Sequence, residues 1–328
     1  MPTNLPPGYH EVEKRYRAAG SMAEKIACLE ELISTIPKHK GTDKLRADYR
    51  RRLSKMKSSA QAGKKTTKQE SPYHIDREGA GQVVVIGPTN VGKSALLVAL
   101  TNATPQVSAA PFTTWTPTPG MMFMENVQIQ LIDTPPLNSD YIDPEMWNLI
   151  RRSDLILLMV DLQADPFQQL EDAIDLLEGR NIVARHRLER YTDPQRLTVK
   201  PLLVLVNKVD DELADEDFEV FCELLEEEWP LLSISSATGY NLEPMKRAVF
   251  EQLEVIRIYS QIPGREPDLE SPFILGRGGT VDEFARQIHQ DFYEKLKAAR
   301  VWGSSAFDGQ MVSRDHVLED GDVVELRI

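Results

Sequence analysis

An α/β fold with a mostly parallel sheet and helices on both faces is predicted for the middle of this 328-residue chain. Short apolar stretches recur at 82–87, 127–133, 154–161, 201–208 and 231–236, and longer amphipathic stretches lie between them. The first apolar stretch runs directly into GPTNVGKS, residues 87–94. Alternation of strands and helices favours parallel pairing, because each connecting helix crosses back over one face of the sheet.

The remainder of the chain adds one region on each side of this α/β region. Apolar residues recur at helical spacing on both sides of a turn near 37–43, which predicts a helical hairpin over 1–62. A polar stretch over 63–79 is typical of a flexible linker. The α/β region then occupies 80–260, and a small α+β region occupies 264–328.

The α+β region is predicted to open with a strand and then a helix. Thr280 and Glu283 fit a capping box at the start of that helix. Short strands follow and end in DVVELRI. The apolar face of the predicted helix consists of Val281, Phe284, Ile288, Phe292 and Leu296.

Charge is distributed unevenly along the chain. The net charge is -13, which disfavours a general nucleic-acid binder, and we expect no DNA partner. Residues 38–70 nevertheless carry twelve Lys or Arg and only three Asp or Glu. The predicted helix over 44–57 therefore presents a basic face. Two interpretations of that face stay open: contact with RNA phosphates, or simple solvation.

An acidic helix is predicted over the stretch from 210 to 229, which holds eleven acids and no base. Its buried side is expected to consist of Phe218, Val220, Phe221, Leu224 and Leu225.

Composition also bounds where the protein acts. No stretch reaches the ~18 apolar residues that a membrane-spanning helix needs, and the first seven residues lack a signal-peptide pattern. Cys28 and Cys222 are far apart in the sequence and form no metal-binding pattern. We therefore expect a cytoplasmic protein with no membrane partner.

GPTNVGKS fits the phosphate-binding pattern G-x-x-x-x-G-K-[ST] at every defined position. Glycines allow backbone N–H groups to approach phosphate oxygens, and the N-terminus of the following helix favours negative charge. Lys93 would reach the β- and γ-phosphates, and Ser94 would bind Mg²⁺. The candidate contacts from this loop are Gly87, Pro88, Thr89, Asn90, Val91, Gly92, Lys93 and Ser94.

Further motifs follow at the ends of later strands. Asp133 stands where a P-loop protein places the carboxylate behind its metal ion. Asn207, Lys208 and Asp210 form N-K-x-D, whose carboxylate accepts from guanine N1–H and the exocyclic amine together. This donor pair is absent from adenine. The backbone N–H groups of Ser236 and Ala237 would bind guanine O6, with Ser235 supporting their turn.

Together these motifs resemble the Obg-like GTPases, and most closely the developmentally regulated GTP-binding (DRG) proteins. The stretch AAPFTTWTPTPG, residues 109–120, carries the F-T-T sequence of that branch. The resemblance implies that Thr114 closes over Mg²⁺ and the γ-phosphate, with Phe112 and Thr113 beside the nucleotide. ARVWGSS and RDHVLEDGDVVELRI look like a TGS domain, a ubiquitin-like β-grasp module.

The resemblance implies a GTPase that binds GTP and GDP and requires Mg²⁺, with Lys93, Thr114 and Asn90 as its catalytic residues. It also implies action on ribosomes or RNA through the basic helix and the TGS domain. Asn90 is the fourth residue of the phosphate loop. In cation-activated GTPases an asparagine at that place in the loop holds K⁺, but asparagine is also a common turn residue. Potassium as a cofactor therefore stays open.

Two departures from the family pattern favour an alternative function. Pro136 stands where the family places a glycine whose N–H contacts the γ-phosphate, and proline has no N–H. Leu137 stands where Ras-type enzymes place a glutamine that orients water. Hydrolysis should therefore be slow without an activator. The alternative is a nucleotide-binding scaffold with negligible hydrolysis that regulates a protein partner.

Overall fold

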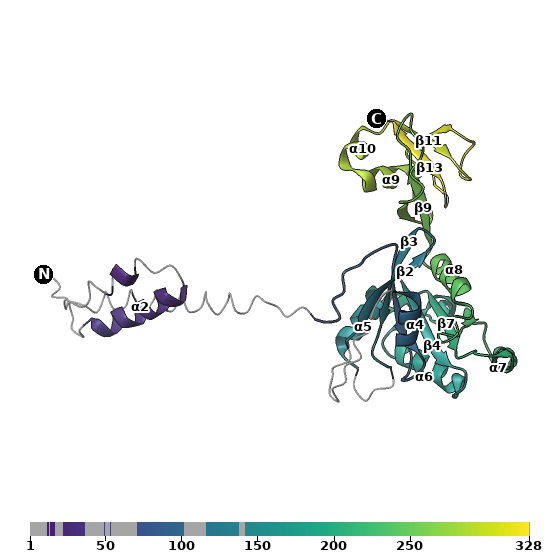
Figure 1. The fold of residues 1–328 in the computed structure, drawn as a ribbon, viewed down its shortest axis with the longest axis horizontal. Helices are drawn as coiled ribbons and strands as arrows, with labels where there is room; N and C mark the ends of the chain where they lie inside the picture. Colours follow the sequence, from purple (N-terminus) through teal and green to yellow (C-terminus); the bar gives the residue numbers. More distant parts are fainter. Residues whose placement is uncertain are drawn as a thin grey trace. The chain divides into compact units, whose positions relative to one another are not determined.

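The computed structural model describes residues 12, 14–16, 22–36, 49, 53, 71–101, 116–137 and 142–327 (Figure 1). The chain divides into two compact units, Met1–Ser71 and Pro72–Ile328. Each unit is described by itself. Among the described residues, no helix combines the length and the apolar content needed to cross a membrane.

The N-terminal unit contains α2 (Met22–Thr35), one of the two helices predicted there. Leu29, Leu32 and Ile36 are buried on one side of it. Tyr49 is buried in the same cluster, and Leu53, one helical turn later, packs against it. These two contacts fit a helical hairpin. The rest of the basic segment 44–57 lies outside the described residues, so the hairpin stays a prediction.

The second unit begins with the predicted α/β fold. Among its described residues, six strands form one sheet in the order β2-β3-β1-β4-β7-β8. All neighbouring pairs are parallel except β2 and β3, which are antiparallel. The strands are β1 (Gln82–Ile86), β2 (Thr118–Met124), β3 (Val127–Asp133), β4 (Leu155–Asp161), β7 (Leu202–Asn207) and β8 (Leu231–Ser233).

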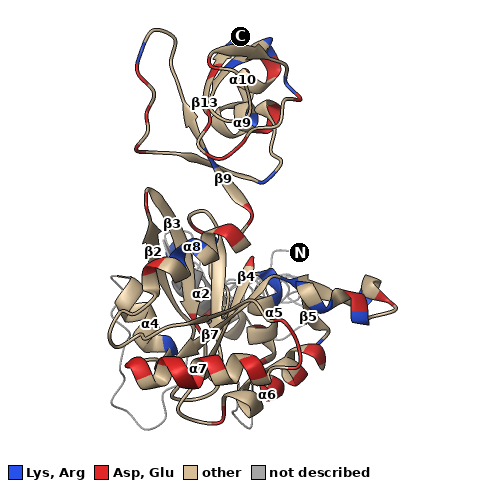
Figure 2. Cartoon of the chain, turned by 90° about the vertical axis from the view of Figure 1, so that its right-hand side faces the viewer, with Lys and Arg blue, Asp and Glu red and all other residues tan. Residues whose placement is uncertain are grey.

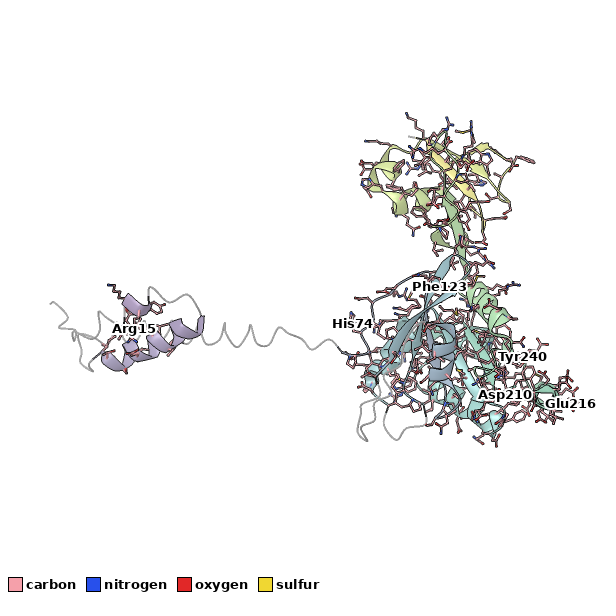
Figure 3. All side chains as sticks on the ribbon, viewed as in Figure 1. Arg15, His74, Phe123, Asp210, Glu216 and Tyr240 are labelled. Carbon is pink, nitrogen blue, oxygen red and sulfur yellow. The ribbon has the colours of Figure 1, made fainter. Side chains whose placement is uncertain are left out.

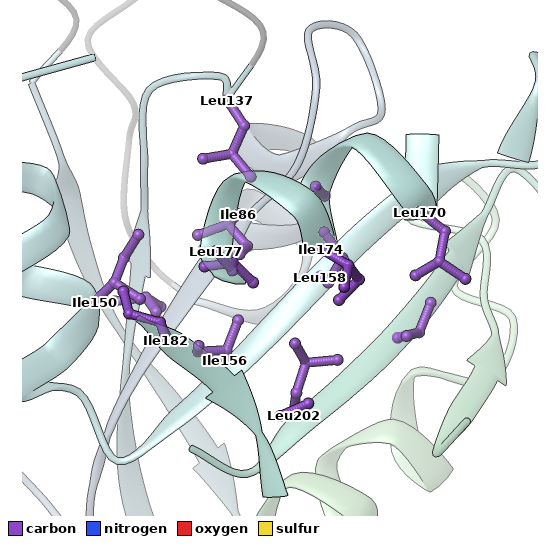
Figure 4. Close-up of a cluster of buried hydrophobic side chains, with 14 of the residues drawn as sticks. Ile86, Leu137, Ile150, Ile156, Leu158, Leu170, Ile174, Leu177, Ile182 and Leu202 are labelled. Carbon is purple, nitrogen blue, oxygen red and sulfur yellow. The ribbon is translucent and has the colours of Figure 1, made fainter. Parts of the chain in front are cut away.

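Helices cover both faces of this sheet, as predicted. Val84 and Ile86 of β1 point into a cluster with α5 and α6, whereas Val83 and Val85 point into a cluster with α4 and α8. Successive side chains of a strand alternate between faces, and because both faces are covered here, residues 83–86 of β1 are all apolar. Figure 4 shows part of the first cluster. The helices are α4 (Lys93–Leu100), α5 (Pro144–Arg152), α6 (Pro166–Glu178), α7 (Glu212–Leu224) and α8 (Leu242–Gln252).

Four further elements lie between α6 and β7. A small parallel pair consists of β5 (Ile182–Ala184) and β6 (Thr198–Lys200). The 3₁₀ helices η1 (Arg185–Arg190) and η2 (Pro194–Arg196) connect the two strands.

The α/β fold differs from the prediction at its start. A linker is predicted over 63–79, but residues 72–79 belong to the second unit and pack on its sheet. Tyr73 is buried, and its carbonyl accepts from Arg152 at 2.8 Å. A buried amide pair, Gln82 and Gln130, also holds this segment through the carbonyls of residues 75 and 76. Backbone carbonyls, rather than apolar side chains, make most of these contacts. The amino-acid sequence of the segment is therefore polar and resembles that of a linker.

The predicted apolar side of α7 is also partly wrong. Phe221 is buried, but Val220 is 54% exposed and Leu224 is 62% exposed. Phe218 and Leu225 pack against the core only partly. Residues 218, 221 and 225 share one face of a helix, whereas 220 and 224 lie beside it and are left open.

The C-terminal β-grasp fold is present as predicted. Among its described residues, five strands form a sheet in the order β10-β9-β13-β11-β12, in which β9 and β13 are parallel. Phe284 is fully buried at the centre of the apolar cluster. The elements are β9 (Val255–Ser260), β10 (Phe273–Gly276), α9 (Val281–Ile288), α10 (Gln290–Lys295), β11 (Ala298–Trp302), β12 (Gln310–Val312) and β13 (Val323–Arg327).

Two details of this domain differ from the sequence prediction. β9 pairs with β10 and β13 and so belongs to this sheet, whereas the sequence predicts 255–260 as part of the α/β region. The predicted single helix breaks at His289, whose backbone is extended. The ring of His289 accepts from the backbone N–H of Asp291 at 3.1 Å and caps the second helix. Thr280 accepts from the N–H of Glu283, which bears out the predicted cap.

The turn between β2 and β3 connects the two sheets of this unit. Arg257 of β9 forms ion pairs with Glu125 in that turn and, at 2.7 Å, with Asp320. The amide of Asn126 donates to the hydroxyl of Tyr259 at 2.9 Å and to the carbonyl of Leu269 at 3.0 Å. This turn links β2, which follows residues 102–115, to β3, which ends at Asp133.

Candidate nucleotide site

The GPTNVGKS loop lies between β1 and α4, at the carboxyl edge of the sheet. Gly87 and Gly92 have φ angles of 147° and 100°. A Cβ on Gly87 would lie 2.3 Å from the carbonyl oxygen of Met159, and one on Gly92 would lie 2.3 Å from the side-chain nitrogen of Asn207. Both glycines are therefore required by conformation and by space. Asn90 is exposed and left-handed, with φ 65°, as its interpretation as a turn residue expects.

Lys93 is the first residue of α4 and is 6% exposed. Its ammonium group donates to the carbonyl of Gly87 at 2.9 Å and to that of Pro88 at 2.7 Å. Burial lowers the pKa of Lys93 to about 8, although Asp133 opposes that shift. A cation held at a helix N-terminus beside two carbonyls of the loop is suited to a polyphosphate.

Ser94 and Asp133 form the candidate metal pair. The Ser94 hydroxyl donates to Oδ2 of Asp133 at 2.5 Å. The other carboxylate oxygen, Oδ1, is buried and has no hydrogen-bond partner among the described residues. Burial raises the pKa of Asp133, while Ser94 and Lys93 act against that rise. A hydroxyl beside an unsatisfied carboxylate oxygen fits Mg²⁺, which binds few protein groups and keeps waters or phosphates in its remaining positions.

The segment after Asp133 turns back under the phosphate loop. Thr134 is 3% exposed and donates from its hydroxyl to the carbonyl of Val85 at 2.7 Å. The backbone N–H of Leu137 donates to the carbonyl of Gly87 at 3.1 Å. The Leu137 side chain is 3% exposed and lies in the apolar cluster of Figure 4. In this arrangement it is buried in the core and does not face the nucleotide side of the loop.

Asn207 connects the phosphate loop with the predicted base-binding loop. It ends β7 and is 3% exposed. Its amide nitrogen donates to the carbonyl of Val91 at 2.7 Å. Its amide oxygen accepts from the backbone N–H of Ser236 at 2.9 Å and from the Ser236 hydroxyl at 3.1 Å. One buried side chain therefore fixes the distance between two loops that are far apart in the sequence.

Asp210 is held by the turn that follows β8. The hydroxyl of Ser235, which is fully buried, donates to Oδ1 of Asp210 at 2.5 Å and accepts from the N–H of Thr238 at 3.0 Å. Asp210 itself is exposed, and Figure 3 shows it on the same side of the domain as Tyr240. Ala237 is exposed as well. The structure thus places Ser235 against Asp210 and Ser236 against Asn207, and their roles in binding guanine stay predictions.

The sequence analysis missed the partner of Lys208. Lys208 has a left-handed backbone, with φ 71°, and forms an ion pair with Oδ2 of Asp161. Asp161 ends β4 directly beside Asn207, and its other oxygen accepts from the N–H of Gln163 at 3.0 Å. An acid at the end of the strand next to N-K-x-D was the available signal. This signal depends on β4 and β7 being neighbours in the sheet, which neither segment encodes.

Three predicted contacts lie outside the described residues: Phe112, Thr113 and Thr114. Their roles stay predictions. The described contacts come from four separate stretches, and all of these stretches leave the carboxyl ends of β1, β3, β7 and β8. This edge is where open parallel sheets bind their ligands.

Comparison with known proteins identifies the two domains and the relatives of the chain. Residues 82–208 match the family described as 50S ribosome-binding GTPase, and residues 256–328 match the TGS domain. An uncharacterized GTP-binding protein of Methanocaldococcus jannaschii is 30% identical over 93% of this chain and 92% of its own length. A developmentally-regulated GTP-binding protein 2 homolog of Dictyostelium discoideum is 24% identical over 92% of this chain and 98% of its own.

A solved structure shows the same fold. The Schizosaccharomyces pombe YchF GTPase superposes with a TM-score of 0.55 at 14% identity, covering 77% of this chain and 99% of that one. At this identity the likeness concerns the fold alone. The full-length match to the archaeal relative, together with both domain matches, decides the family. The chain belongs to the GTP-binding proteins that combine a GTPase domain with a TGS domain, and developmentally-regulated GTP-binding proteins are among its relatives.

Proposed function

We propose that this protein is a slow, Mg²⁺-dependent GTPase that works as a switch on the ribosome or on another RNA. The observation that carries the proposal is the bridge made by Asn207 between the phosphate loop and the Ser236 turn. A nucleotide that contacts both loops would bind to a frame already set at fixed spacing. Preorganisation of this kind favours tight and selective binding, because little ordering remains to be done.

Each group in the site has a distinct proposed task. Lys93 and the backbone N–H groups of residues 87–94 hold the phosphates. Asp210 reads the guanine edge, with Lys208 held beside it by Asp161. Ser94 and Thr114 would hold Mg²⁺, with Asp133 behind a water, and this ion would neutralise charge on the phosphates. No general base is proposed, because positioning and charge suffice for this reaction.

Action on the ribosome rests on two observations. The family that matches residues 82–208 is described as ribosome-binding. The segment 38–70 is strongly basic within an otherwise acidic chain, and Lys/Arg contacts to phosphates provide affinity that does not depend on sequence. The proposal places RNA on the segment around 44–57 and on the TGS domain, and it places the protein in the cytoplasm.

Leu137 gives the alternative function its support. Its side chain is buried in the core, so position 137 offers no polar group to orient an attacking water. Pro136 supplies no N–H to the γ-phosphate. The alternative is a nucleotide-binding scaffold that regulates a protein partner with negligible hydrolysis.

Steady-state GTP turnover with and without purified ribosomes tests the proposal. The full-length chain is assayed with Mg²⁺ in potassium buffer and again in sodium buffer. Stimulation by ribosomes of tenfold or more supports the switch. Faster turnover in potassium than in sodium supports K⁺ at Asn90, and Asn90→Ala should then remove the difference between the buffers.

Two controls make the test decisive. Lys93→Ala should remove turnover by removing phosphate binding, which identifies any contaminating GTPase. Pro136→Gly should restore an N–H toward the γ-phosphate and raise turnover if that contact limits the rate. Tight GTP binding without turnover, in either buffer and with or without ribosomes, would refute the switch and support the scaffold.

A further inference from the structure

A groove between α6 and α7 lies away from the residues of the candidate nucleotide site. Its volume is about 560 Å³. Phe167, Leu170 and Ile174 of α6 line it at spacings of three and four residues, so one face of α6 forms the floor. Leu225 and Trp229 also contribute to the apolar lining. The three α6 residues span seven positions, or about 10 Å, which is roughly two turns of a helix laid alongside.

Acidic side chains stand on both rims of this floor. Glu171 and Asp175 are exposed on α6, and Glu226 is exposed after α7. Among the described residues, none of these three carboxylates forms an ion pair with a Lys, Arg or His. Figure 2 shows the concentration of acidic residues along α6 and α7.

The single base that lines the groove is already neutralised. Arg187 forms ion pairs with Glu178 at 2.5 Å and with Glu227 at 3.4 Å, and its guanidinium stacks over Trp229 at 5.4 Å. The groove therefore presents an uncompensated negative rim around an apolar floor.

The apolar surface continues from the groove onto α7. Leu224 lines the groove and is 62% exposed, and Val220, one turn earlier, is 54% exposed. Apolar side chains this exposed on adjacent turns typically mark an interaction site. The sequence analysis placed both residues in the core, and the structure leaves both uncovered.

We propose that this groove binds an amphipathic helix of a partner protein, with an apolar stripe flanked by Lys or Arg on both sides. The stripe would lie on the α6 floor and against Leu224, and the flanking bases would meet the two acidic rims. This is the helix-in-groove mode of recognition with complementary charge. RNA does not fit, because the unpaired rim carboxylates would repel its phosphates.

A designed peptide provides the probe. A fluorescein-labelled 15-residue helix carries leucines at positions i, i+3, i+4 and i+7, with lysines flanking that stripe. Its binding to the full-length chain is measured by fluorescence anisotropy at about 0.15 M salt, where long-range attraction is largely screened. A second peptide of the same composition, with the stripe scrambled, controls for charge.

Two matched pairs of variants separate the groove from the general acidity of the surface. Glu171→Lys with Asp175→Lys reverses one rim. Glu212→Lys with Glu219→Lys makes the same charge change on α7 outside the groove. Leu224→Ser is compared with Leu213→Ser, which is 71% exposed on the same helix but does not line the groove. Every changed side chain is exposed, so all four variants should fold.

The proposal expects that the rim reversal weakens binding at least about tenfold, while the matched reversal weakens it less than about twofold. Leu224→Ser should weaken binding and Leu213→Ser should not. Equal losses within either pair, or equal binding of the scrambled peptide, overturn the proposal.

Two other occupants have their own outcomes. A peptide of residues 38–57 that binds the groove more tightly than the designed helix would make this chain the occupant and would overturn the partner. Self-association that the rim reversal abolishes, measured by light scattering, would assign the groove to a second copy instead.

Discussion

Nucleotide binding should change the protonation of Lys93. In the nucleotide-free protein burial lowers its pKa from 10.5 to about 8, so the ammonium is about half deprotonated at pH 8. Phosphate groups placed against it favour the charged form and should return its pKa to the ordinary range or higher. Binding of GDP should then take up about 0.5 proton at pH 8 and about 0.9 at pH 9.

Isothermal titration calorimetry measures this uptake directly. GDP is titrated in buffers of different ionisation enthalpy, and the slope of observed enthalpy against that quantity gives the number of protons. Above pH 8 the phosphates of GDP are fully ionised and contribute no protons of their own. Lys93→Arg is the control, because its guanidinium stays charged. Its slope should vanish at pH 8, and at pH 9 it gives the protons taken up by guanine N1 alone, which are subtracted. A slope near zero for the unaltered chain at both pH values refutes the reasoning.

The same shift sets a pH dependence of stability. The unfolded chain holds the Lys93 proton up to about pH 10.5, whereas the folded, nucleotide-free chain releases it near pH 8. The unfolded state thus binds more protons between these values, so stability should rise with pH in that window. The full effect is about 3 kcal/mol, and urea unfolding should show it only without GDP. A GDP-bound chain with the same rise would contradict this.

Three substitutions test other contacts of the second unit. Asn207→Ala removes three hydrogen bonds to two loops, worth about 1 kcal/mol each, so GDP affinity should fall roughly 100-fold by calorimetry. Asn207→Asp puts a buried carboxylate against the carbonyl of Val91 and should lose at least as much, and an unchanged affinity in Asn207→Ala would refute the bridge. Asp133→Asn should raise the Mg²⁺ concentration for half-maximal turnover at least about tenfold, and an unchanged value would exclude Asp133 from the metal site. Arg257→Ala should lower the melting temperature by a few degrees, because about 1–3 kcal/mol of charged hydrogen bonds are lost. GDP affinity should stay unchanged. An unchanged melting temperature would show that these ion pairs do not contribute to stability.

Local motifs explain why so much of the site could be predicted. Gly87, Gly92 and Lys93 work through backbone conformation and a helix N-terminus, which eight consecutive residues encode. The central strands β1, β4 and β7 could be recognised because both faces of the sheet are covered there, so nearly all of their residues are apolar and buried. Sequence order then placed Asp133 and Asn207 at the same edge.

Contacts between distant segments explain what was missed. Asp161 holds Lys208 only because β4 and β7 are neighbours, and strand order is not written in either segment. The alternating burial pattern of β9 would be the same in either sheet, so it does not predict which sheet β9 joins. Leu224 and Val220 are apolar at positions where helical periodicity allows burial, but no other element covers them. Whether a face is covered is a property of the whole fold.

β9 decides where the GTPase domain can be separated from the rest of the chain. A fragment that ends at residue 260 would retain β9 but lose β10 and β13, its partners on either side. Such a strand keeps unpaired N–H and C=O groups along both edges and readily joins strands of other chains. A GTPase fragment that stays monomeric should therefore end after α8, before Val255, and a C-terminal fragment should begin there.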